Sequence, residues 1–170
     1  PVLIGVYAAI CRELGAPLDF PGTQACYDAV SEVTDARQLG RAMVFLATSP
    51  AARNQAFNVT NGDHYRWRNL WPRLAEYFGI ACGQVRTFNL ATWMADKEPV
   101  WQQIVARHDL RPMPLVEIVL WPFGDFLLRQ GQDTMSSMTK IRQAGFHEIV
   151  DTEAMYLEHI ARYRAARILP

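Results

Sequence analysis

Histidine and cysteine are the residues that could bind a metal ion or act as nucleophiles, and their spacing favours neither role. No histidines share a helix face at ligand spacing, and no CxxC pair is present. His147 and Glu148 begin like a zinc-protease motif, but Asp151 stands where the second histidine is required. We therefore expect no metal ion and predict three reduced cysteines in a cytoplasmic protein.

The sequence motifs that bind a dinucleotide and support hydride transfer are also missing from this chain. None of the ten glycines forms a GxGxxG or GxxGxxG sequence, which a pyrophosphate needs at a helix N-terminus. A tyrosine activated by a lysine four residues later is absent, because the two lysines, Lys97 and Lys140, do not follow a tyrosine at that spacing. We predict no catalytic and no cofactor-binding residue in this chain, which alone should be inactive.

One aromatic segment, residues 120–126 (LWPFGDF), could instead bind an apolar molecule. Pro122 and Gly124 are expected to interrupt a helix there and to turn aromatic side chains toward a cavity. Apolar walls with a broken backbone are typical of sites for small hydrophobic ligands. The residues alone favour a pocket and a core position for Phe123 equally.

Composition limits the class of protein further. The chain has 170 residues, half of them apolar, which suits one globular domain with a sizeable core. Its 17 basic and 17 acidic side chains balance, which argues against nucleic-acid binding. The apolar run at residues 2–11 is too short to span a bilayer, so no membrane association is expected.

Helices should position these side chains along most of the chain. Periodicity and stop signals predict them over residues 2–14, 35–48, 63–79, 92–108 and 137–144, and from residue 151 onward. The 35–48 helix is expected to turn Leu39, Met43 and Leu46 inward. Thr34 or Asp35 is the expected cap of this helix, and Asp63 and Asp151 are the expected caps of the 63–79 helix and of the last helix.

Proline and glycine should modify several of these helices. Pro72 is expected to cost a hydrogen bond or to kink the 63–79 helix, and Pro99 to divide the 92–108 helix. Gly79 and Gly145 are expected to end theirs. His159, in the last helix, is interpreted as an interfacial core residue.

Short extended segments complete the predicted architecture. Alternation and flanking turn residues predict them at residues 18–20, 27–33, 56–60 and 85–89. Such short strands form an independent sheet poorly. The predicted fold class is α/β, dominated by helices, with a few short strands.

Several sequence stretches resemble progesterone 5β-reductase and the iridoid synthase-like enzymes, a group of extended short-chain dehydrogenases/reductases. They run in order over essentially the whole chain and are FNVTNGDHYRWRNLWPRLAEYFGI (57–80), DKEPVWQQIV (96–105), LWPFGDFLL (120–128) and SMTKIRQAGF (137–146). The resemblance is to the C-terminal half only. It implies that residues 1–170 are one substrate-binding domain fragment of a Rossmann-type enzyme, without the N-terminal NAD(P)-binding domain. A start at Pro1, with no initiator Met, fits a piece of a longer polypeptide.

The resemblance also implies an activity and a site. Enzymes of this group use NADPH, held by the missing half, to reduce the C=C bond of enones or enals, so the partner would be a small apolar carbonyl compound. Phe123 matches an aromatic residue that flanks the substrate. Proximity in sequence adds Trp121, Phe126, Met135 and Met138 to the expected substrate-binding residues. A homodimer is left open.

Two alternatives remain beside this interpretation. The chain could belong to an NAD-dependent epimerase/dehydratase of the same extended family, although an aromatic segment suits an apolar substrate better than a sugar. It could also be a module that binds a small hydrophobic molecule without chemistry. The helix at residues 2–14 counts against the second alternative, because an apolar helix needs burial on all sides.

Overall fold

Helices make up most of the structure, a computed structural model that describes residues 1–170. In chain order the elements are α1 (Val2–Glu13), β1 (Leu18–Phe20), α2 (Gln24–Asp28), α3 (Ala36–Thr48), the 3-10 helix η1 (Pro50–Ala52), α4 (Trp67–Phe78), β2 (Cys82–Val85), α5 (Leu90–Met94), α6 (Glu98–Arg107), α7 (Leu115–Ile118), α8 (Trp121–Leu127), α9 (Thr139–Gln143) and α10 (Thr152–Ala165). The two strands pair in parallel, with Leu18 opposite Cys82. The predicted helix-dominated α/β class is confirmed, and no helix is long and apolar enough to cross a bilayer.

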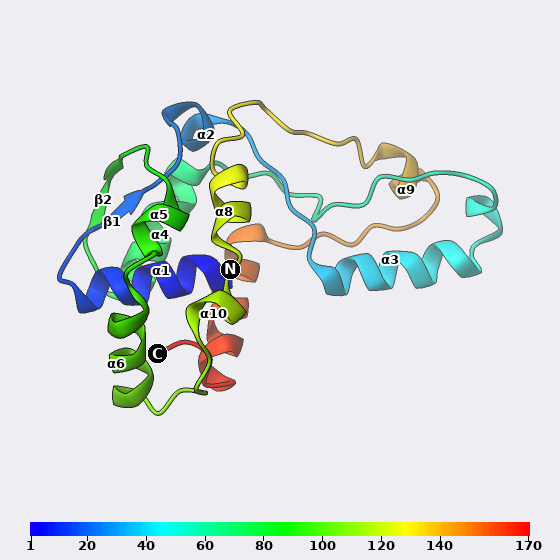
Figure 1. Ribbon diagram of the computed structural model, residues 1–170. Helices are drawn as coiled ribbons and strands as arrows, with labels where there is room; N and C mark the ends of the chain where they lie inside the picture. Colours follow the sequence, from blue (N-terminus) through cyan, green and yellow to red (C-terminus); the bar gives the residue numbers. More distant parts are fainter.

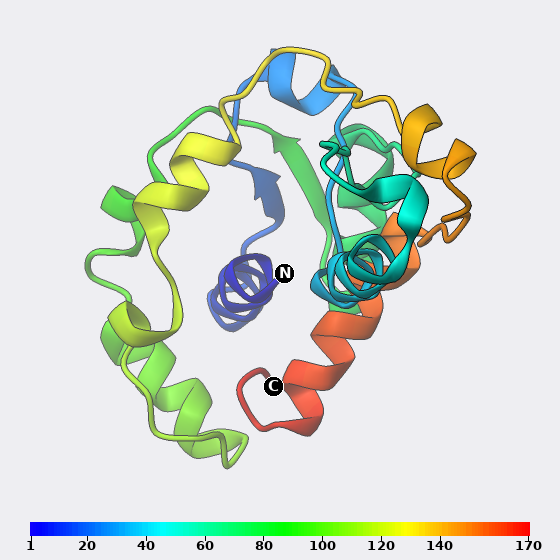
Figure 2. The same cartoon turned by 90° about the vertical axis from the view of Figure 1, so that its right-hand side faces the viewer.

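Helix α1 forms the centre of the molecule. Every residue from Ile4 to Cys11 is buried, because nearly all of its side chains are apolar. Figure 2 shows α1 end-on, inside a ring made by the other elements. It packs against α4, α6 and α10. The expected burial of this helix is confirmed, but the chain itself supplies it, so the helix does not count against a stand-alone binding module. Gly15 follows the helix with a positive φ of 65°.

Helix α4 presents one aromatic and aliphatic face to α1. Trp71 is almost fully buried, and its indole Nε1 donates to the carbonyl of Leu18 at 2.9 Å. Pro72 lies inside the helix, which continues over its 12 residues, and Gly79 ends it with φ 66°. The prediction for Asp63 is wrong: Arg66 occupies the N-cap without a side-chain bond.

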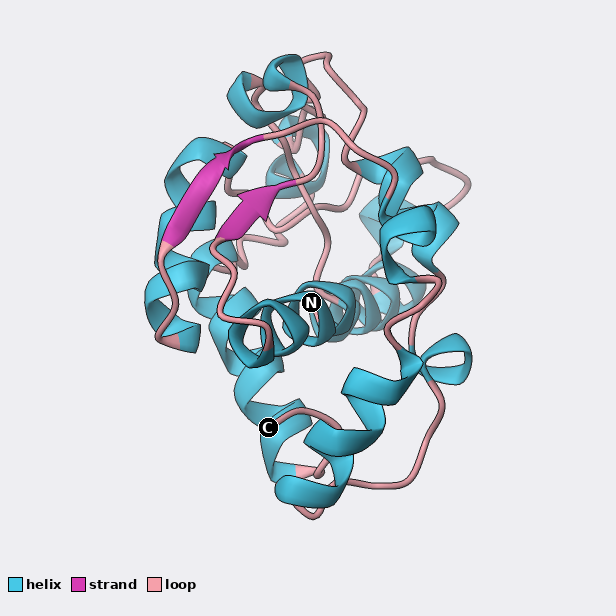
Figure 3. Ribbon diagram, turned by 60° about the vertical axis from the view of Figure 1, so that its left-hand side comes forward, coloured by secondary structure: helices cyan, strands magenta, loops and turns pink.

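Two of the predicted strands are absent and a third is displaced. Residues 27–33 contain the end of α2 and a single antiparallel bridge between Ser31 and Tyr65, and residues 56–60 form no strand. The predicted 85–89 strand lies earlier, at Cys82–Val85, where β1 supplies its partner (Figure 3). Alternation of side chains marks an extended segment, but a strand also needs a neighbour for its backbone groups.

The α3–α9 lobe, which we define as residues 36–60 and 138–148, stands apart from the main body formed by the other elements (Figure 1). Of the two expected caps, Thr34 and Asp35, it is Asp35 that caps α3, by accepting from the amide of Arg37 at 2.7 Å. The predicted inner face is wrong for Leu39 and Met43, which are exposed, whereas Leu46 packs against the lobe's core. Contact with α9 instead buries the face that carries Ala42.

The remaining helices differ from prediction mainly at their boundaries. The 92–108 segment breaks at residues 95–97, and Pro99 lies in the first turn of α6. The 115–129 segment forms two helices: Pro122 opens α8, and Gly124 lies within it. Helix α9 begins at Thr139 rather than residue 137, while Gly145 ends it with φ 108°.

Candidate functional site

An apolar cavity of about 310 Å³ lies between the start of α1 and the α7–α8 segment. Eleven of its thirteen lining residues are hydrophobic. They come from four parts of the chain and include Leu3, Ile4, Trp67, Phe123, Leu127 and Tyr156. The volume is at the lower end of the range of about 300–1,000 Å³ that is usual for small-molecule sites. The arrangement can therefore hold a small apolar body.

Close packing between α1 and α8 shapes this cavity. Gly124 faces Leu3 so closely that an added Cβ would collide with the leucine methyl group. The glycine leaves room for this leucine side chain, and the neighbouring Phe123 lines the cavity. Pro122 occupies the first turn of α8, where its missing N–H costs nothing.

The opposite wall is aromatic. The rings of Trp67 and Tyr156 are both buried and lie 5.9 Å apart in an edge-to-face arrangement. Tyr65 packs edge-to-face against both of them, at 5.3 and 6.0 Å. Burial raises the pKa of Tyr156, so its phenol stays neutral. This wall is uncharged and suits an apolar ligand.

Of the five residues expected to bind substrate, the structure places only Phe123 in this cavity. Phe126 stacks on Phe123 with ring centroids 6.5 Å apart, but it lies on the outer surface. Trp121 lines a separate cavity of about 420 Å³ together with Met94 and Leu115. Two positions along a helix correspond to a rotation of about 200° around its axis, so Trp121 and Phe123 point to different sides of α8. Three positions bring residues back to the same face, as for Phe123 and Phe126.

The two methionines lie away from the cavity. Met135 is exposed in the segment between α8 and α9. Met138 is buried in the α3–α9 lobe, where its sulfur accepts from the amide of Thr60 at 3.3 Å. Neither lines the cavity that contains Phe123. Proximity in sequence is therefore a poor guide to which side chains share a cavity, and substrate binding by the two methionines stays a prediction.

Of the thirteen lining residues, only Phe123 was expected at the site. Among the others, Leu3, Ile4 and Tyr156 come from the first and last helices, and Trp67 comes from α4. Their apolar character in the sequence is the same as that of any core residue. Only the packing of α1, α4 and α10 brings them to one cavity, so no local sequence signal could have identified them.

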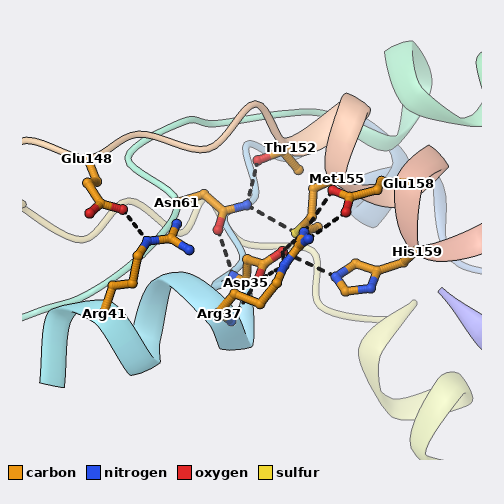
Figure 4. A network of polar contacts seen from close by, with 9 residues as sticks. All are labelled: Asp35, Arg37, Arg41, Asn61, Glu148, Thr152, Met155, Glu158 and His159. Carbon is orange, nitrogen blue, oxygen red and sulfur yellow. Dashed lines mark hydrogen bonds and ion pairs between the residues drawn. The ribbon is translucent and has the colours of Figure 1, made fainter. Parts of the chain in front are cut away.

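A polar network connects the lobe to α10, and Figure 4 shows its members. The buried carboxylate of Asp35 accepts from the Arg37 guanidinium at 2.7 Å, and His159 Nε2 lies 3.2 Å from it. Arg37 also pairs with Glu158 at 2.5 Å. Hydrogen bonds from Arg37 hold the pKa of Asp35 well below its usual value. His159 thus lies between two elements, as expected of an interfacial residue.

A dinucleotide does not fit the residues of this chain. The best candidate for a phosphate loop is residues 21–23, which connect β1 to α2. Gly22 is required there because an added Cβ would collide with the carbonyl oxygen of Leu128. The Leu128 carbonyl lies against this turn and accepts from the amide of Thr23, so that amide does not face an anion, and α2 has only five residues. The structure also contains no group of three or more His, Cys, Asp or Glu that could hold a metal ion.

Comparison with known proteins supports the resemblance. An (S)-8-oxocitronellyl enol synthase of Nepeta racemosa is 37% identical over 168 residues, which cover 97% of this chain and 42% of that protein. The 3-oxo-Δ4,5-steroid 5β-reductase of Arabidopsis thaliana is 33% identical over 168 residues, with coverage of 97% and 43%. The chain therefore spans less than half the length of these curated relatives. The profile of the PRISE-like Rossmann-fold domain matches residues 2–170, and the chain belongs to this family.

Proposed function

We propose that this chain is the substrate-binding part of an NADPH-dependent reductase that reduces the C=C bond of α,β-unsaturated ketones or aldehydes. The observation that carries the proposal is the apolar cavity lined by Phe123, in a chain similar to a 5β-reductase of 3-oxo-Δ4,5-steroids. Such a steroid joins a compact apolar body to one conjugated carbonyl group. A cavity with hydrophobic walls stabilises that body by removing it from water.

The residues of this chain would contribute binding and orientation. A nicotinamide cofactor supplies the hydride in a reduction of this type, and no residue described here fits the dinucleotide. The ring of Phe123 and the aromatic wall around Trp67 would hold the substrate from two sides. Fixing a substrate in one orientation is itself a large part of catalysis, because it removes the entropy cost of alignment from the reacting step.

The lining of the cavity favours an enone over a nucleotide-sugar. A sugar needs several hydrogen-bonding groups, because every buried hydroxyl without a partner weakens binding. Only two lining side chains, those of Trp67 and Tyr156, carry a polar atom. The epimerase/dehydratase alternative is therefore the weaker one.

Calorimetric titration with progesterone, a cyclic enone, and with citral, a linear enal, tests the proposal. Phe123 is 54% exposed and would bury its remaining surface on the ligand, so Phe123→Ala should weaken binding about five- to tenfold. Met43→Ala is the matched control, because this large apolar side chain is 61% exposed but lies in α3, away from the cavity and from Phe123. Equal losses for the two variants, or no binding by the unmodified chain, would contradict the proposal.

Addition of NADPH separates binding from turnover. Because no dinucleotide site is present, the 170 residues alone should bind the enone without oxidising NADPH. Oxidation of NADPH by these residues would show that the chain holds the cofactor, contrary to the packing around Gly22. If a longer form of this polypeptide also bound the enone and never reduced it, the module without chemistry would be the better description.

A further inference from the structure

Helix α8, which carries Phe123, is too short to be stable without contacts to the rest of the molecule. It has only seven residues, Trp121–Leu127, and helices this short have little stability by themselves. The direction in which Phe123 points must therefore be set by contacts between α8 and its neighbours. Side-chain and backbone contacts of this kind exist at the middle and at the C-terminal end of the helix.

Asp125 provides the contact in the middle. Its side chain is buried, with 8% of the residue exposed. Oδ1 accepts from the amide of Leu90 at 2.6 Å, and Oδ2 accepts from the amide of Ala91 at 3.1 Å. These amides begin α5 and have no partner within that helix. A carboxylate that accepts two such bonds is held firmly, because both bonds are charge-assisted.

The C-terminal end of α8 is held by backbone contacts. The carbonyl of Leu128 accepts from the amide of Thr23 at 3.2 Å. Cys26 Sγ lies 3.7 Å from the carbonyl of Leu127. These contacts fix one end of the helix near α2. Trp121 is buried beside Met94 of α5, and Asp125 adds the hydrogen bonds that fix α8 against the start of α5.

We propose that Asp125 is a positioning residue for substrate binding, which acts through Phe123 and does not touch the ligand. Two positions apart on a helix, the carboxylate and the ring lie on nearly opposite faces. The carboxylate faces α5, and the ring lines the cavity, whose lining does not include Asp125. Asp125 thereby sets the angle at which Phe123 meets the ligand. The inference rests on the proposed function of this cavity.

A double-mutant cycle distinguishes positioning from a general loss of stability. Asp125→Asn keeps the shape but leaves one amide of α5 without an acceptor. We expect it to weaken progesterone binding about tenfold in the unmodified protein and less than about twofold in Phe123→Ala, because residues that act as a unit are not additive. Equal losses in the two backgrounds, or no loss in either, would overturn the proposal.

Asp19→Asn is the matched control. Asp19 is also mostly buried, with 13% of its side chain exposed, and accepts from the backbone amide of Gln84 at 2.9 Å, but it does not line the cavity. This variant should leave progesterone binding unchanged even if its melting temperature falls. A tenfold loss of affinity in Asp19→Asn would mean that any lost carboxylate anchor has the same effect, and Asp125 would have no special role.

A measurement without ligand keeps the two proposals separate. Gly124 and the methyl groups of Leu3 are in contact, so their protons should give nuclear Overhauser effects. These effects should weaken in Asp125→Asn and persist in Asp19→Asn. Persistence in Asp125→Asn would show that Asp125 does not position α8. Absence of progesterone binding by the unmodified protein would contradict the proposed function instead.

Discussion

The main body and the α3–α9 lobe are held together in different ways. One cluster of 30 buried hydrophobic residues fills the main body, around α1. The lobe has a cluster of only four, Ala42, Met138, Ile141 and Phe146. Since each fully buried large side chain contributes about 1.5–3 kcal/mol, the stability of the main body exceeds that of the lobe by a wide margin.

Polar contacts replace apolar packing where the two regions meet. Asn61 is fully buried there, accepts from the amide of Asp35 at 2.7 Å and donates to Thr152 Oγ1 at 3.2 Å. Buried polar groups contribute little net stability but are costly to leave unpaired. The main body therefore fixes the shape of the cavity, whereas the position of the lobe depends on a few hydrogen bonds. Each of the following changes tests that difference.

The largest effect is expected in the main body. Trp71→Ala would leave a cavity beside α1 and remove the bond from the indole to Leu18. Removal of a buried tryptophan costs about 3–5 kcal/mol. Denaturant unfolding monitored by far-UV circular dichroism should show this loss over the whole molecule. A loss below about 1 kcal/mol would mean that the central cluster is not the source of stability.

A smaller and local effect is expected at the junction. Asn61→Ala leaves the amide of Asp35 buried without an acceptor, which costs about 1–3 kcal/mol. Hydrogen exchange should quicken in α3 while α4 remains protected, because the packing of α4 does not depend on this residue. Equal acceleration in both helices would show that the two regions unfold as one unit.

Acid should weaken the junction through Asp35. Arg37 lowers the pKa of the Asp35 carboxyl group in the folded state. The ionised carboxylate therefore stabilises the fold fully at pH values above the pKa of the unfolded chain, about 3.9, and this stabilisation is lost as the pH falls below that value. The loss should be about 1.4 kcal/mol for each pH unit within that window. The difference in unfolding free energy between the unmodified protein and Asp35→Asn, measured from pH 7 to 2.5, should shrink with acid. A constant difference would contradict the assigned ion pair.

The smallest effect is expected at the surface of the lobe. Arg41 pairs with Glu148, and about half of each side chain is exposed. Exposed ion pairs contribute about 0–1 kcal/mol, and salt screens them. Glu148→Gln should therefore change the melting temperature little. In 1 M NaCl the variant and the unmodified protein should have the same melting temperature. A loss as large as that of Asn61→Ala would mean that the lobe is held by surface charge.

Helices were predictable where the chain carries its own start and stop signals. Asp35 and Asp151 cap the helices that follow them, and Gly79 and Gly145 end theirs, because these effects act within a few residues. Asp63 shows the limit of such reasoning. Its carboxylate accepts from the amide of Thr152, far along the chain, at 2.9 Å, and so caps no helix of its own segment.

Features that depend on a distant partner were not predictable. Residues 56–60 alternate like a strand but have no strand beside them. Leu39 and Met43 follow a helical period, yet the position of α9 selects the other face of α3. Phe123 was proposed as a site residue because the family resemblance implies it, whereas nothing in the sequence pointed to Leu3 or Tyr156. Tertiary packing alone brings those two residues to the cavity.

Methyl-detected NMR during titration with progesterone is the most direct test of the central claim that the cavity beside Phe123 binds an enone. Resonances of Leu3, Ile4 and Leu127 should shift, because these residues line the cavity. The resonance of Ile141, in the core of the α3–α9 lobe, should not move. Shifts confined to the lobe, or no shifts at ligand concentrations near solubility, would contradict the account.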